Sequence, residues 1–144
     1  MSFVRLDKIN ATAHIETIVA TTDLVNGQFL ALGALQADGE ARLATPAGTG
    51  DLVFHASVPL QYESLAEEKD FKLPAGKAGR GLVLTAGDIV SVPKGTLAEN
   101  DVVVSSATGF VATLEAIPAD AVSGKVIAIE TVGNVGELAV IRVA

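Results

Sequence analysis

Hydrophobic residues along this chain come in short aliphatic runs, each introduced by a polar turn. The same arrangement occurs three times, with turns at Asn26-Gly27-Gln28, Ala86-Gly87-Asp88 and Glu99-Asn100-Asp101. Gly and Asn tolerate the positive φ that a tight turn needs, and the branched residues that follow suit a pleated strand. The recurrence therefore predicts strands that begin near Phe29, Ile89 and Val102.

Other parts of the chain have the same character. Further strands are expected over residues 13–21, 41–45, 51–58, 82–85 and 110–114, with a hairpin turn at 37–40 and a second hairpin over 124–144. Strands and turns repeated at about ten-residue spacing are typical of a small β-barrel or β-sandwich rather than a parallel α/β sheet. The predicted fold class is all-β.

Two segments depart from this pattern. Residues 60–72 are rich in helix formers and lack β-branched residues, so we expect one irregular or short helical insertion near residues 60–70. Residues 1–12 alternate poorly and carry both charges, which is consistent with an N-terminal arm or an edge strand. No linker is long or polar enough to divide the chain, so residues 1–144 are predicted to form a single β domain.

Composition narrows the range of partners. The chain is 49% hydrophobic but only 4% aromatic, so its core must be aliphatic, with few aromatic platforms for a base or a sugar. The large anchors available to the core are Phe3, Phe29, Phe54, Phe71 and Phe110. A net charge of −7 disfavours binding to nucleic acid and to anionic membranes, and it is compatible with a basic protein partner.

Cysteine is absent, which excludes disulfides, thiolate metal sites and a cysteine nucleophile. Residues 1–7 lack the apolar region of a signal peptide, and no apolar run approaches the roughly 20 residues that span a bilayer. These features predict a soluble protein made in a reducing cytoplasm.

No residue cluster suggests catalysis. His14 and His55 fall in expected strands without further ligands at a zinc-site spacing, so a solvent-facing or hydrogen-bonded strand histidine is the favoured interpretation. Glu67, Glu68 and Asp70 adjoin one another in a charged stretch and are predicted to be solvated rather than a glycosidase pair. The G-x-S-x-G surroundings of a catalytic serine are absent at six serines, Ser57, Ser64, Ser91, Ser105, Ser106 and Ser123. We expect no enzyme activity, no metal and no cofactor.

A basic stretch interrupts the acidic chain. Lys69, Lys72, Lys77 and Arg80 stand within twelve residues, and the last two belong to the glycine-rich segment Pro74–Gly81. Such a segment can cradle a phosphate through its backbone amides, but the Walker spacing is absent. A flexible or partner-ordered loop is therefore the favoured interpretation, and its charge makes it a candidate contact surface.

Five segments carry a resemblance that covers nearly the whole chain. They are Leu6–Asn10, Asn26–Gly33, Phe71–Arg80, Gly87–Val90 and the hairpin ending in Leu138–Val143. In their order they resemble small head decoration, or cement, proteins of tailed bacteriophages. The resemblance implies a protein of the virion that is made in the host cytoplasm and has no enzyme activity. It also implies that the protein binds the major capsid protein on the outside of the expanded head and thereby braces the shell.

The resemblance also suggests how the capsid would be contacted. An N-terminal arm could add a strand to a neighbour's sheet, with Phe3, Val4, Arg5 and Leu6 at the contact. The basic residues Lys69, Lys72, Lys77 and Arg80 would then meet an acidic surface of the shell. Two alternatives stay open, a phage tail or fibre component and a small β-barrel ligand-binding module with its site at Gly76–Gly81. A homo-oligomer is compatible with either viral role.

Overall fold

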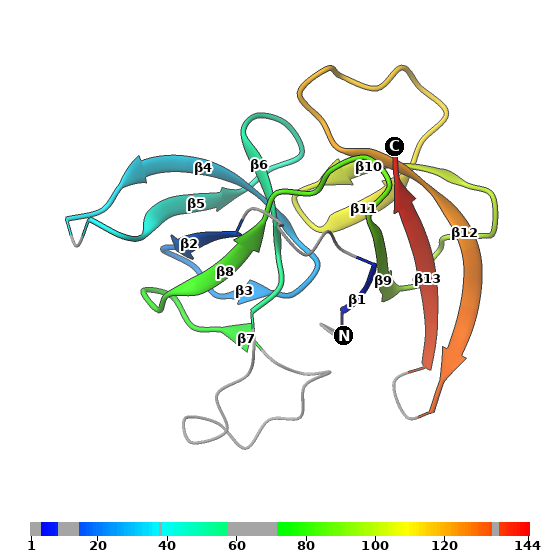
Figure 1. Cartoon of the computed structure of the whole chain (residues 1–144), viewed down its shortest axis with the longest axis horizontal. Helices are drawn as coiled ribbons and strands as arrows, with labels where there is room; N and C mark the ends of the chain where they lie inside the picture. Colours follow the sequence, from blue (N-terminus) through cyan, green and yellow to red (C-terminus); the bar gives the residue numbers. More distant parts are fainter. Residues whose placement is uncertain (1–3, 9–14, 38, 58–71, 134–135) are drawn as a thin grey trace.

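Two β structures lie side by side in the molecule, a closed barrel and an antiparallel sheet (Figure 1). A computed structural model of the chain describes residues 4–8, 15–37, 39–57, 72–133 and 136–144. The strands are β1 (Arg5–Lys8), β2 (Ile15–Val19), β3 (Leu24–Val25), β4 (Phe29–Leu35), β5 (Arg42–Pro46), β6 (Leu52–His55), β7 (Lys72–Leu73), β8 (Gly79–Leu82), β9 (Ile89–Pro93), β10 (Val102–Ser106), β11 (Gly109–Ala112), β12 (Ser123–Val132) and β13 (Gly136–Val143).

The strands are shared out between the two structures. The barrel closes in the order β2-β5-β4-β6-β8, with β2 and β5 parallel and the other neighbours antiparallel. The sheet has the order β1-β9-β13-β12-β10-β11, and β3 with β7 forms a separate pair. The all-β prediction is confirmed, and the molecule contains a barrel together with an open sheet. The insertion expected near residues 60–70 falls outside the described residues.

The three repeated turns have the same construction. Positive φ values occur at the expected positions, 97° at Gly27, 94° at Gly87 and 72° at Asn100. In each turn the next side chain then accepts a hydrogen bond from the backbone N–H three residues before it. The acceptors are Gln28 Oε1, Asp88 Oδ2 and Asp101 Oδ2, at 2.8, 2.9 and 2.9 Å from the amide nitrogens of Val25, Thr85 and Ala98. Each turn is thus fixed by local chemistry, which confirms the prediction.

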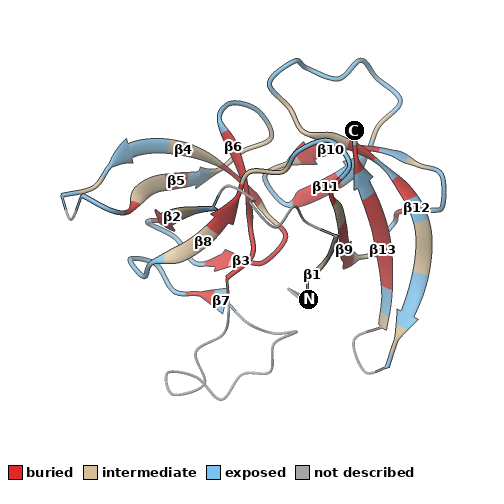
Figure 2. Cartoon of the chain, in the orientation of Figure 1, coloured by how far each residue is buried: buried red, intermediate tan, exposed pale blue. Residues whose placement is uncertain are grey.

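One hydrophobic core joins the barrel to the sheet. Phe29 of β4 and Phe54 of β6 face Phe110 of β11, with ring centroids 4.8 Å apart for Phe29 and Phe110 and 6.2 Å apart for Phe54 and Phe110. Valines and isoleucines of the sheet complete this cluster, among them Val90 and Ile141. Figure 2 shows the buried residues concentrated where the barrel strands meet the sheet. The two structures therefore depend on the same buried side chains.

Strand β6 is buried along its whole length because both of its faces are covered. Phe54 packs in the core shared with the sheet, whereas Val53 belongs to a second cluster that also contains Ile18 and Leu30. This second cluster draws on β2, β4 and β6 and fills the barrel with aliphatic side chains. A short continuous apolar run is typical of a strand buried on both faces.

The glycine-rich segment is partly a barrel strand. Gly79–Leu82 forms β8 and pairs with both β2 and β6. A Cβ at Gly81 would lie 2.7 Å from Val53 Cγ2, and one at Gly79 would lie 2.7 Å from Ser57 Oγ. Glycine is needed at these two positions because neighbouring segments of the chain approach closely in a small barrel. The prediction of a flexible loop was therefore wrong for residues 79–81.

Replacing Gly81 by Ala is expected to destabilise the protein by about 1–3 kcal/mol, the usual cost of forcing an extra carbon into a packed interior. The quantity to measure is the free energy of unfolding by chemical denaturation. Gly39→Ala is a comparison for the other reason to need glycine, because Gly39 has a positive φ of 75° and open space around it, whereas Gly81 has no positive φ. Its cost, about 1–2 kcal/mol, reports backbone strain alone. Equal stability of Gly81→Ala and the wild-type chain would contradict the close-approach explanation.

Candidate functional site

A serine and a histidine form a hydrogen-bonded pair inside the barrel end of the molecule. Nε2 of His55 lies 2.7 Å from Oγ of Ser57, and Nδ1 lies 2.8 Å from the carbonyl oxygen of Val25. A carbonyl can only accept, so Nδ1 carries the proton and Nε2 accepts from the Ser57 hydroxyl. The His55 side chain is thus held as one neutral tautomer.

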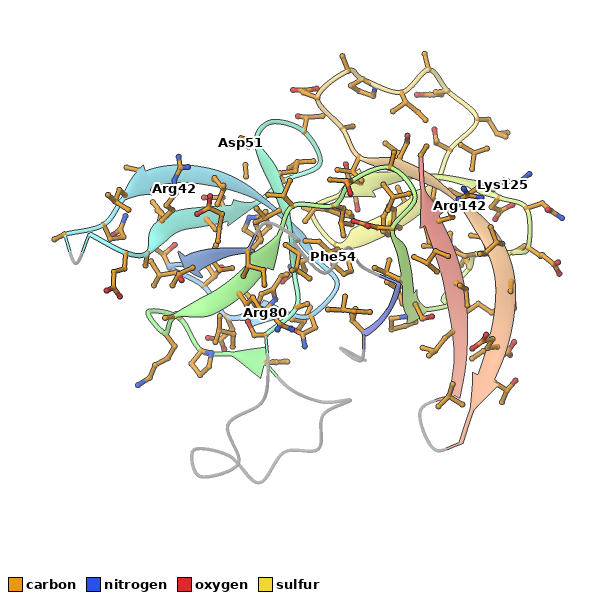
Figure 3. All side chains as sticks on the ribbon, viewed as in Figure 1. Arg42, Asp51, Phe54, Arg80, Lys125 and Arg142 are labelled. Atoms are coloured by element: carbon orange, nitrogen blue, oxygen red, sulfur yellow. The ribbon has the colours of Figure 1, made fainter. Side chains whose placement is uncertain are left out.

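Further hydrogen bonds tie this pair to its surroundings. Ser57 Oγ accepts from the backbone N–H of Arg80 at 3.0 Å. The side chain of Asn26 exchanges two hydrogen bonds with the backbone of Ser57, at 2.9 and 3.0 Å. Arg80, which is labelled in Figure 3, donates a hydrogen bond from Nε to the carbonyl oxygen of Ala56 at 2.7 Å. The network joins the turn before β4 to the end of β6 and to β8.

A hydroxyl bonded to an oriented imidazole is the arrangement of a nucleophile and its base. In this chain His55 is 0% exposed and Ser57 is 7% exposed, so a substrate has no route to the hydroxyl. The hydroxyl also already accepts from Arg80 and donates to His55. We therefore assign the pair a structural role. The expectation of a hydrogen-bonded strand histidine is confirmed for His55, while His14 lies outside the described residues.

The pairing of Ser57 with His55 does not follow from the sequence around Ser57, which lacks the pattern of a catalytic serine. The spacing that could have revealed it is the separation of two residues, which places both side chains on the same face of an extended segment.

Burial lowers the pKa of His55 below its usual 6.5, against the opposing effect of the hydrogen bond to Val25. A lowered pKa means that the unfolded chain binds the proton more readily than the folded chain. The stability due to neutral His55 is therefore complete above pH 6.5 and is lost as the pH falls below it.

Wild-type protein should accordingly lose more stability between about pH 7.5 and about pH 5.5 than His55→Gln, because glutamine does not titrate in this range. The measurement is the denaturation midpoint of both proteins at both pH values. The comparison subtracts the contribution of His14 and of the carboxylates. Identical pH dependence of the two proteins would contradict the assignment of a buried neutral imidazole.

The predicted N-terminal contact residues are largely committed to the chain's own fold. Strand β1 pairs with β9 at the edge of the sheet, which is the edge-strand alternative for Arg5–Lys8. Val4 and Leu6 are half-buried and pack against the core cluster. Phe3 lies outside the described residues. These contacts leave Val4 and Leu6 less available for pockets on a partner.

The structure separates the predicted basic residues from one another. Lys72 in β7 and Lys77 in the following turn are exposed, whereas Arg80 is half-buried and donates to Ala56. Lys69 lies outside the described residues. The part of this stretch that is available for a partner in the described structure is therefore the exposed pair Lys72 and Lys77.

A second basic surface, which was not predicted from the sequence, lies on the sheet. An open hollow of about 600 Å³ is lined by Lys125 of β12, Arg142 of β13 and the apolar side chains of Val102, Ile117 and Ile127. Figure 3 shows Lys125 and Arg142 close together on the side of the sheet away from the barrel. We call this surface the basic hollow.

Strand register brings these residues together from distant parts of the chain. Val102 pairs with Lys125, and Lys125 pairs with Arg142, so the three stand in one row across β10, β12 and β13. Two like charges directly opposite each other in a sheet are destabilising. Among the described residues neither basic side chain has an ion-pair or hydrogen-bond partner. The sheet thus holds two positively charged side chains next to each other, neither of them paired with a described side chain.

Neither a candidate metal site nor a membrane-spanning helix occurs among the described residues. Within the described ranges no group of three or more histidine, aspartate or glutamate side chains could hold a metal ion. The same part of the chain contains no helix long and apolar enough to cross a membrane. Comparison with protein families, curated proteins and solved structures gives no match to this chain.

Proposed function

We propose that this chain is a non-enzymatic structural protein of a virion, which binds the outer surface of the capsid and stabilises the head. The major capsid protein is its partner in this proposal. The observation that carries the proposal is the distribution of chemistry between interior and surface. The Ser57–His55 pair, which resembles a nucleophile with its base, is buried, whereas several large apolar side chains are exposed on the surface.

The surface apolar residues suit adhesion at several points. They are Ile15, Leu35, Val102, Val111, Leu114, Ile117 and Ile127, each more than a third exposed. Leu114 projects fully from the loop between β11 and β12, and Ile117 of the same loop lines the basic hollow. Isolated surface apolar groups are ordinary, but several that adjoin one hollow are typical of a protein-binding surface. Weak contacts repeated by capsid symmetry would give high avidity without a deep pocket.

The shared core supports a bracing role as well. Phe29, Phe54 and Phe110 connect the barrel and the sheet, so the two structures cannot move apart without exposing buried aromatic surface. A protein that ties neighbouring capsomers together must transmit force between its own contact points. A body built around one continuous core is suited to that task.

The test is co-sedimentation of the purified chain with expanded capsid shells of the source virus, stripped of accessory proteins. Saturable binding at a fixed ratio to the shell protein is expected, with weaker binding to unexpanded shells as the control. Absence of binding to expanded shells would overturn the proposal. A stable ring in free solution that binds purified tails would instead indicate a tail component. A melting temperature raised by inorganic phosphate would indicate a ligand-binding module.

A further inference from the structure

We infer that the basic hollow is the docking site for an acidic segment of the partner protein, one that presents a carboxylate beside apolar side chains. This inference deepens the proposed function and rests on it for the identity of the partner, the capsid shell. Its starting point is the juxtaposition of Lys125, Arg142, Val102, Ile117 and Ile127 around one open hollow.

Charge complementarity selects the occupant. The whole chain carries a net charge of −7, yet the described side chains that line the hollow include two basic groups and no acidic one. A carboxylate placed between Lys125 and Arg142 would relieve the repulsion that their direct pairing across β12 and β13 creates. The guanidinium of Arg142 can bind such a carboxylate with two parallel hydrogen bonds, which adds geometric specificity.

The apolar part of the hollow supplies contact area beside the charges. Val102 is 46% exposed, Ile117 37% and Ile127 42%. Ile127 stands where the register between β12 and β13 shifts, between Val126 and Ala128. Bulges of this kind are frequent next to functional sites. The alternating burial of residues 124–127 places Ile127 on the same exposed face as Lys125, and the bulge interrupts that alternation only after Ile127.

The exposed pair Lys72 and Lys77 offers charge without such contact area. The turn that carries Lys77, residues 74–78, is exposed and otherwise holds only Pro, Ala and Gly. Strand β7 lies at the barrel end of the molecule, far from the sheet strands that carry Lys125 and Arg142 (Figures 1 and 3). Rim charges of this kind change association rate more than affinity, whereas buried contact area slows dissociation. The basic hollow is therefore the stronger candidate for the main contact.

The experiment compares two charge reversals of equal size. One variant carries Lys125→Glu with Arg142→Glu, and the matched control carries Lys72→Glu with Lys77→Glu. Both change exposed side chains, so thermal unfolding should show that both remain folded. Binding is measured by co-sedimentation with expanded, stripped capsid shells over a range of protein concentrations. We expect the hollow variant to lose affinity by about tenfold or more and the control to stay within about threefold of the wild type.

Each outcome has a distinct meaning. Failure of the wild-type chain to bind the shells would overturn the proposed function together with this inference. Wild-type binding with equal loss in both variants would show a general charge effect and overturn the inference alone. A larger loss in the Lys72 and Lys77 variant would assign the contact to the β7 turn and also overturn it. A raised salt concentration should weaken wild-type binding more than binding of the hollow variant.

Discussion

Replacement of Phe54 by Ala is expected to destabilise the chain by about 3–5 kcal/mol, a large share of the roughly 5–15 kcal/mol that holds a typical domain folded. Phe54 is fully buried, and its ring lies 5.3 Å from that of Phe29 and 6.2 Å from that of Phe110. The truncation therefore leaves a cavity where the barrel meets the sheet. The measurement is chemical denaturation followed by circular dichroism.

The same variant tests whether the two β structures are held as one unit. Amide hydrogen exchange should accelerate together in β4 of the barrel and β13 of the sheet, because both depend on the shared core. Val111→Ala is the control: this residue lies on β11 but is exposed, so its loss should change stability by no more than about 0.5 kcal/mol. Faster exchange in β4 alone would contradict a shared core.

Ser57→Ala is expected to cost about 2–6 kcal/mol, since it leaves two polar groups without partners at about 1–3 kcal/mol each. The groups are Nε2 of His55, which loses its donor, and the backbone N–H of Arg80, which loses its acceptor. The measurement is again the free energy of unfolding. Thr49→Val is the control, because it removes a hydroxyl from an exposed position. A loss no greater than that of the control would show that the network contributes little.

Ser57→Ala also tests the non-enzymatic proposal. The sealed position of the hydroxyl predicts no hydrolysis of a small activated ester, such as p-nitrophenyl acetate, by the wild-type chain above the rate in buffer. Hydrolysis by the wild-type chain that disappears in the folded Ser57→Ala variant would mean that Ser57 is reached by substrate. The proposal of a purely structural protein would then be contradicted.

Local chemistry explains which parts of the fold could be predicted. The turns at Gly27, Gly87 and Asn100 each need a positive φ and a side-chain acceptor in the next residue, and both requirements are visible within a few positions of sequence. The hairpin of β12 and β13 is predictable for the same reason, since glycines at 133 and 136 frame its turn.

Long-range packing explains where the sequence interpretation failed. Gly79 and Gly81 look like loop residues, but their lack of a side chain is required by Ser57 and Val53, more than twenty residues earlier in the chain. Glycine frequency alone cannot distinguish a mobile turn from a strand pressed against its neighbours. The parallel pairing of β2 with β5 likewise depends on closure of the barrel and not on either strand's own pattern.

The basic hollow was missed for a related reason. Val102, Lys125 and Arg142 are widely separated in sequence, and only the register of β10, β12 and β13 places them in one row. By contrast, the cluster from Lys69 to Arg80 is conspicuous along the sequence. In the folded barrel, however, Arg80 is half-buried and donates a hydrogen bond to the carbonyl of Ala56. Among the described members of this cluster, only Lys72 and Lys77 are exposed. The distribution of basic residues along the sequence thus predicts too large a surface at Lys69 to Arg80 and does not predict the basic hollow.

The thermal stability of the viral head tests the central claim most directly. Heads filled with DNA and stripped of accessory proteins would be heated with and without the purified chain, and the temperature of DNA release recorded. A protein that binds the intact shell and not its dissociated parts must raise that temperature in a concentration-dependent way. The account predicts such a rise, saturating at the ratio found by co-sedimentation. A release temperature that does not change at saturating protein would contradict a role in stabilising the head.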